Sequence, residues 1–273
     1  MEKVTNFFGL FRKEKITYQN LRTINLVAAG LHAGQAILVV ALSGAASGIF
    51  PVTTNYLALD AIASAASGQP VLATATHHLF DIKLAYIVAA FFLMSAVAHY
   101  LVANEYRKKY EAGLKKGINK FRWVEYAFSA STMMVGIALL SGISDISSLM
   151  MIFALTAIMN LMGLVMEVHN QTTKKTNWLS FKIGVIAELA AWSAIAIYLG
   201  GAIFYGSGVP TFVYFIYGSL FVFFSCFAVN MYLQYKQIGK WKNYVYGERV
   251  YIILSLVAKS ALAWQVFAGA LRP

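Results

Sequence analysis

The sequence predicts an all-α membrane protein, a bundle of seven transmembrane helices in one domain. Three observations lead to this prediction. The mean hydropathy is +0.64 and only 12% of the 273 residues are charged, whereas a soluble domain has roughly 25%. The apolar residues gather into seven segments, each long enough to cross a bilayer, which takes about 20 residues. The basic residues lie in alternate connections between these segments.

Each apolar segment is predicted to be a helix, because a backbone in lipid has to satisfy its own hydrogen bonds. The segments are residues 22–43, 82–103, 121–142, 147–168, 179–204, 209–235 and 247–270. The sequence has no internal repeat and no sign of a second domain. We therefore expect residues 1–273 to form a single unit.

The distribution of basic residues predicts the orientation of the chain. Of the 22 lysines and arginines, 19 lie in residues 1–22, 107–122, 174–182 and 236–249. The positive-inside rule places these segments, and the N-terminus, in the cytoplasm, and an odd number of spans then places the C-terminus outside. The net charge of +11 is spread between apolar spans, which argues against nucleic-acid binding. One cysteine allows no internal disulfide, and no metal motif is present.

Residues 44–81 form an unusually long connection, which the orientation places outside the cell. Two strand-like runs, Phe50–Tyr56 and Pro70–Thr76, are separated by small residues and a Ser-Gly-Gln-Pro turn signal. This pattern favours a short β-hairpin over the outer face. The alternative is a short amphipathic helix through Leu57–Ala66.

The last apolar segment carries a lysine near its middle, Lys259. A charged amine there costs roughly 2.5–3.5 kcal/mol on insertion scales. Either a carboxylate neutralises the lysine, or a carbonyl cofactor has condensed with it as a Schiff base. Glu248 and Ser255 share its helix face.

The third segment supplies the preferred carboxylate, Glu125. Asn119, Arg122, Glu125 and Ser129 recur at spacings of three or four and form one polar stripe. The side chain of Lys259 is expected to point back along its helix, toward the depth of Glu125. An opposite charge in a dry site would keep a Schiff base protonated. A purely structural ion pair is the alternative.

Two histidines within the membrane are candidates for a proton site. His32 and Gln35 share a face of the first segment, and Ser95 and His99 share a face of the second. The two pairs could meet across the bundle around a water molecule. Alternatively, both histidines are neutral and bonded to serine or backbone.

Local sequences resemble those of the heliorhodopsins. These are FRWVEY at Phe121–Tyr126, YLQYKQIGKWKNY at Tyr232–Tyr244, and SLVAKSALAWQVFAGAL at Ser255–Leu271. The resemblance extends from the His32 span to the end of the chain. It implies a seven-helix retinal protein with a β-hairpin in the first extracellular loop and a cytoplasmic N-terminus. The cytoplasmic N-terminus agrees with the orientation predicted from the basic residues.

The resemblance also implies roles for individual residues. Lys259 would carry all-trans retinal as a protonated Schiff base, with Glu125 as counterion and Ser255 beside it. The residues that match or line the retinal pocket are Trp123, Ser129, Met159, Trp192, Phe224 and Trp264. Those that match a polar cavity are His32, Gln35, Ser95 and His99. Those that match a cytoplasmic-side network are Asn119, Arg122, Glu167, Tyr244 and Glu248.

Two positions depart from the family pattern. Thr156 stands where asparagine is expected, which could alter absorption, and Glu188 stands where a small residue is expected. Glu188 therefore places an unassigned carboxyl in or beside the bundle.

The resemblance implies a photoreceptor that signals, forms a homodimer in the cell membrane, and is not an enzyme. Its signalling partner would be cytoplasmic. A light-driven proton pump is the alternative. It is weakened because Gly136, about three turns beyond Glu125, offers no proton donor. A transporter without retinal, using Lys259 and Glu125 as a substrate ion pair, is a third possibility.

Overall fold

The computed structural model describes residues 17–44 and 47–271 of the chain. The basic residues predicted for the N-terminal tail, and Arg272, lie outside the described residues. Seven of the helices in the described part are long and apolar enough to cross a membrane, which confirms the predicted bundle. They are α2 (Tyr18–Leu42), α4 (Leu84–Ala103), α6 (Lys120–Leu140), α7 (Ile146–His169), α8 (Leu179–Phe204), α9 (Thr211–Tyr235) and α10 (Tyr244–Val266). A π-helical turn, η2 (Phe267–Leu271), extends α10.

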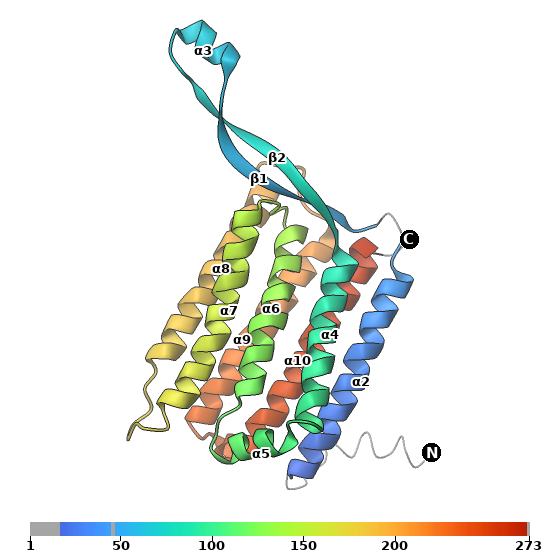
Figure 1. Cartoon of the computed structure of the whole chain (residues 1–273), viewed down its shortest axis with the longest axis vertical. Coiled ribbons are helices and arrows are strands. Elements are labelled where there is room, and N and C mark those ends of the chain that lie inside the picture. Colours follow the sequence, from blue (N-terminus) through green and yellow to red (C-terminus); the bar gives the residue numbers. More distant parts are fainter. Residues whose placement is uncertain (1–16, 45–46, 272–273) are drawn as a thin grey trace.

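The bundle has two distinct ends (Figure 1). At one end, two short helices, α5 (Arg107–Lys115) and η1 (Gly239–Lys242), join long helices. We call this the basic end, because the lysine- and arginine-rich connections lie there. The other end carries the long connection between α2 and α4, and we call it the hairpin end. Helices α6, α8 and α10 run from the basic end toward the hairpin end, and α7 runs back (Figure 1).

A β-hairpin projects from the hairpin end, which confirms the prediction for residues 44–81. Strands β1 (Ile49–Leu59) and β2 (Leu72–Lys83) pair antiparallel, and α3 (Ala61–Ser67) closes the tip. The predicted strand limits were wrong, because both strands are longer and Pro70 lies before β2. The predicted helix through Leu57–Ala66 was also wrong in extent. The chain turns there at Asp60, whose side chain caps α3, and at Gly68, whose φ of +68° suits glycine.

The hairpin is attached to the bundle at the short connection between α6 and α7. The backbone amide of Thr53 donates to the carbonyl of Ser144 at 2.9 Å. The amide of Asn55 donates to the carboxylate of Asp145 at 3.2 Å. The same carboxylate caps the first turn of α7 by accepting from the amide of Ser148. One carboxylate thus joins a strand to a helix.

The largest apolar core lies toward the hairpin end of the bundle. Its fully buried members include Phe92 of α4, Met134 and Ile137 of α6, and Leu262 of α10. The buried charged groups of the membrane-spanning helices, Arg122, Glu167, Glu248 and Lys259, lie elsewhere, between this core and the basic end. Side chains that could react or exchange protons are therefore expected nearer the basic end than this core.

Candidate functional site

Lys259 and Glu125 meet inside the bundle, as their positions on α10 and α6 predicted. Their side chains are 3% and 6% exposed, and the Lys259 Nζ donates to a Glu125 oxygen at 3.4 Å. Nζ also donates to the Ser255 Oγ, one turn earlier on α10, at 2.8 Å. The ring centre of Tyr126 lies 5.1 Å from Nζ. The amine is therefore enclosed by one carboxylate, one hydroxyl and one aromatic face.

The four predicted polar cavity residues lie in three places. Ser95 of α4 donates to the same Glu125 oxygen at 2.6 Å. The His32 and His99 rings are stacked with their centres 5.5 Å apart. Gln35 lies farther along α2, where it accepts a hydrogen bond from Trp264 at 3.0 Å.

The histidines bind neither serine nor backbone in the way considered from the sequence. His99 contacts the side-chain oxygen of Asn25 at 2.7 Å. Neither ring nitrogen of His32 has a hydrogen-bond partner among the described residues. Asn25 was missed, because an asparagine near the end of a span resembles an ordinary interfacial residue.

A cavity of about 160 Å³ extends from Lys259 toward α7, α8 and α9. Of the predicted pocket residues, Trp123, Met159, Trp192, Phe224, Ser255 and Lys259 line it. Ser129 is buried on α6 but outside this lining, and Trp264 packs against Phe267 instead. Trp264 thus lies outside the lining of this cavity, and its contact with retinal stays a prediction. Trp264 follows Lys259 by five residues, which places it on a different face of α10.

Two glycines shape the wall of this cavity. A Cβ at Gly163 would collide with the Trp123 ring, and a Cβ at Gly184 would lie 3.3 Å from the Met159 carbonyl. The wall is thus formed by helices and rings in close contact. An apolar cavity lined by a buried amine suits an apolar aldehyde held at that amine.

Glu188 of α8 also lines the cavity, on the side away from Lys259. The Trp192 Nε1 donates to one of its oxygens at 2.9 Å. The other oxygen has no hydrogen-bond partner among the described residues, and neither has the Thr156 hydroxyl. The two departures from the family pattern, Glu188 and Thr156, therefore both bring buried polar atoms into this part of the bundle.

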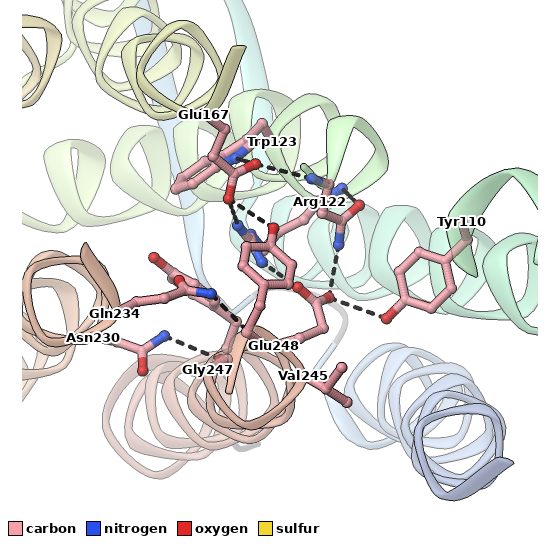
Figure 2. A network of polar contacts seen from close by, with 12 residues as sticks. Tyr110, Arg122, Trp123, Glu167, Asn230, Gln234, Val245, Gly247 and Glu248 are labelled. Atoms are coloured by element: carbon pink, nitrogen blue, oxygen red, sulfur yellow. Dashed lines mark hydrogen bonds and ion pairs between the residues drawn. The ribbon is translucent and has the colours of Figure 1, made fainter. Parts of the chain in front are cut away.

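Figure 2 shows a second polar cluster around Arg122, Glu167 and Glu248. It lies on the basic-end side of Glu125, because Arg122 precedes Glu125 on α6. Arg122 of α6 forms ion pairs with Glu167 of α7 at 2.5 Å and with Glu248 of α10. The Trp123 indole and the Tyr244 hydroxyl donate to Glu167 at 2.7 and 2.8 Å. All of the predicted network residues are joined here.

Further bonds hold Glu248 in this cluster. The Asn119 side chain donates to it at 2.7 Å, and the Tyr110 hydroxyl of α5 donates at 3.1 Å. Burial and the neighbouring Glu248 raise the pKa of Tyr110, so its hydroxyl stays a donor. Tyr110 was missed, because it lies in a basic connection that resembles a solvated charged run.

A cavity of about 30 Å³ separates the two clusters. Its lining includes His99 and Glu125 on one side and Arg122 and Glu248 on the other. This volume is sufficient for a water molecule with several polar partners. The arrangement therefore offers a short polar path from Glu125 to the basic-end cluster.

A family model decides the relationship of this chain to known proteins. The model of the heliorhodopsin family matches residues 21–271. The chain belongs to the heliorhodopsin family. A comparison with curated proteins finds no match.

Solved structures of other rhodopsins share the fold. A light-driven proton pump from Leptosphaeria maculans matches with a TM-score of 0.61 and 14% identity, over 93% of this chain and 97% of that chain. Cyanorhodopsin from the cyanobacterium Tolypothrix matches with a TM-score of 0.61 and 12% identity, over 93% of this chain and 96% of that chain. The transmembrane domain of Salpingoeca rosetta rhodopsin phosphodiesterase matches with a TM-score of 0.58 and 12% identity, over 96% of this chain and 87% of that chain. At these identities the similarity shows the fold alone.

This member of the heliorhodopsin family is a multi-pass membrane protein that binds retinal as its chromophore. The possibility of a transporter without retinal is therefore excluded. The cavity and the buried amine fit this cofactor, whereas the roles of the individual residues stay predictions.

Proposed function

We propose that this heliorhodopsin is a light sensor that holds all-trans retinal on Lys259 and moves no ion across the membrane. It acts as a photoreceptor and not as an enzyme. Retinal supplies light absorption and isomerisation when it is bound. The protein supplies a fixed charge, an apolar cavity and helices that respond.

Lys259 is the residue that would attach retinal through a Schiff base, since its buried side chain lines the cavity. Ser255 orients the Lys259 nitrogen through the bond at 2.8 Å. Glu125 places a negative charge beside that nitrogen, and Ser95 holds the carboxylate from the other side. The aromatic rings of Trp123, Trp192 and Phe224 exclude water from the cavity.

The position of the carboxyl groups is the observation that supports sensing over pumping. The seven long helices contain four carboxylic acids, Glu125, Glu167, Glu188 and Glu248. By the bounds of these helices, all four lie in the half of their helix that is nearer the basic end. A pump needs proton-exchanging groups on both sides of the Lys259 nitrogen. On the hairpin side, Met134, Ile137 and Leu262 fill the interior instead.

Light-induced transport provides the decisive test. We expect cells that express the protein with all-trans retinal to show visible absorption. Illumination of these cells should cause no change in external pH and no photocurrent. Lys259→Ala should abolish the pigment. A coloured Lys259→Ala variant would overturn the attachment site, and a pH change abolished by a protonophore would overturn the sensor proposal.

Proton pumping remains the second candidate function, because Glu188 lines the cavity with one oxygen free of hydrogen bonds to the described residues. If wild type pumps and Glu188→Gln does not, Glu188 is the proton donor. If wild type and Glu188→Gln pump equally, the proton donor is another group. If neither pumps, the sensor proposal stands.

We further propose that the N-terminus is cytoplasmic and that the protein acts as a homodimer. The 19 basic residues of the alternate connections support this orientation. A cytoplasmic protein would then read the light-driven state at the basic end, where Arg122 joins α6, α7 and α10. The mass of the protein in nanodiscs of defined size tests the dimer.

A further inference from the structure

An apolar groove of about 1120 Å³ lies on the outside of the bundle, along α4, α5 and α6. Its walls include Val97 and Leu101 of α4 and Val124 and Phe128 of α6. Val97, Val124 and Phe128 are 56%, 47% and 55% exposed. Because these residues lie on membrane-spanning helices, the groove faces the hydrocarbon of the bilayer.

Three lysines line the same groove at its basic end. These are Lys109 of α5, Lys116, which follows α5, and Lys120 at the start of α6. All three are exposed, and no described carboxylate forms an ion pair with them. Lys109 lies 5.7 Å from the ring centre of Tyr106, so its charge stays at the mouth of the groove. The groove therefore combines a cationic mouth with an apolar body.

We propose that this groove binds one anionic phospholipid from the surrounding bilayer. The phosphate would lie among Lys109, Lys116 and Lys120, and one acyl chain would lie between α4 and α6. The stretch of α6 from Lys120 to Phe128 rises about 12 Å. This length fits within one leaflet of a hydrocarbon core about 30 Å thick.

Charge argues against a second copy of this chain in the groove, and backbone hydrogen bonding argues against a peptide. A second copy of this chain, docked by two-fold symmetry, would bring two sets of three lysines together. An extended peptide segment would bring backbone amides and carbonyls into lipid without partners. A phospholipid has neither problem and supplies the missing negative charge.

The groove also reaches the proposed counterion. Glu125 lines the groove on one side and contacts Lys259 on the other, inside the bundle. A bound acyl chain would therefore cover the lateral face of Glu125. The composition of the membrane thereby becomes part of the environment of the buried ion pair.

Lipid retention tests the proposal without reference to light or retinal. The full-length protein is extracted from vesicles of phosphatidylcholine and phosphatidylglycerol, and bound lipids are weighed by native mass spectrometry. We expect wild type to keep one phosphatidylglycerol. K109Q/K116Q/K120Q should reduce this retention about tenfold or more. K174Q/K175Q/K182Q removes the same charge at the same end, from exposed lysines outside the groove, and should retain the lipid.

A second pair of variants tests whether the acyl chain occupies the groove. Val124→Trp fills the groove and leaves all three lysines in place, whereas Val222→Trp adds the same ring to an exposed position on α9. We expect only Val124→Trp to lose the lipid. Retention by Val124→Trp, equal loss in the two triple variants, or equal retention of the two lipids by wild type would each overturn the proposal.

Discussion

At the scale of single residues, Glu125 and Glu188 place two carboxyl groups in very different relations to Lys259. Glu125 contacts the Lys259 amine at 3.4 Å, whereas Glu188 accepts a hydrogen bond from Trp192 on its own helix, α8. A negative charge beside the retinal nitrogen holds the positive charge there and so widens the gap to the excited state. The identity of the counterion therefore controls colour.

Glu125→Gln should shift the absorption maximum to longer wavelength, because the neutral amide no longer holds the positive charge at the nitrogen. The measurement is the visible spectrum of the purified pigment with all-trans retinal. Glu188→Gln is the matched control, since it replaces a carboxyl that lines the cavity beside Lys259 but does not contact the Lys259 amine. An unchanged spectrum in Glu125→Gln would remove Glu125 from the counterion role.

Arg122 is the residue on which the basic-end cluster depends. Its guanidinium pairs with two buried carboxylates, Glu167 and Glu248, and stacks on Tyr251 with its carbon 3.9 Å from the ring centre. Arg122→Met should leave both carboxylates buried without a cation and cost roughly 3–5 kcal/mol. Glu167→Gln should cost less, because Arg122 keeps Glu248. Thermal unfolding of the retinal-free protein in detergent distinguishes the two variants, and equal loss would contradict this account.

At the scale of elements, Asp145 joins β1 to α7. The Ser147 hydroxyl, the Ser148 amide and the Asn55 amide hold the pKa of Asp145 below its usual value. Since the pKa is lower in the folded state, the stabilisation is complete above the unfolded value of about 3.9. It is lost as the pH falls through the folded-state value. The attachment of the hairpin should therefore be constant near neutral pH and weaken in acid.

Asp145→Ala should weaken this attachment by roughly 1 kcal/mol, as expected for loss of a helix cap. Hydrogen exchange of the Asn55 and Ser148 amides, corrected for the intrinsic rate at each pH, measures the effect. Asp60→Ala is the control, because Asp60 caps only α3 at the hairpin tip. If Asp145→Ala leaves both amides protected, the carboxylate does not hold the hairpin to the bundle.

At the scale of the whole molecule, hydropathy predicted the seven spans because lipid forces each apolar segment to be helical. It did not determine which face of each helix turns inward. Trp264 and Gln35 bind one another away from the cavity, and Tyr110 reaches Glu248 from α5. These contacts depend on how helices pack, which a uniformly apolar segment does not specify. Lys259 and Glu125 were predictable because charged residues in lipid are rare.

The proposed orientation of the whole molecule rests on the distribution of charge alone and can be tested directly. In a Cys226→Ser background, Ser67→Cys places a thiol at the hairpin tip and Lys175→Cys places one in the connection between α7 and α8, both at exposed positions. A membrane-impermeant maleimide applied to intact cells should label Ser67→Cys. It should label Lys175→Cys only after the cells are permeabilised. The reverse pattern would show that the basic connections face outward. The positive-inside rule would then fail for this chain, and a partner at the basic end would have to be extracellular.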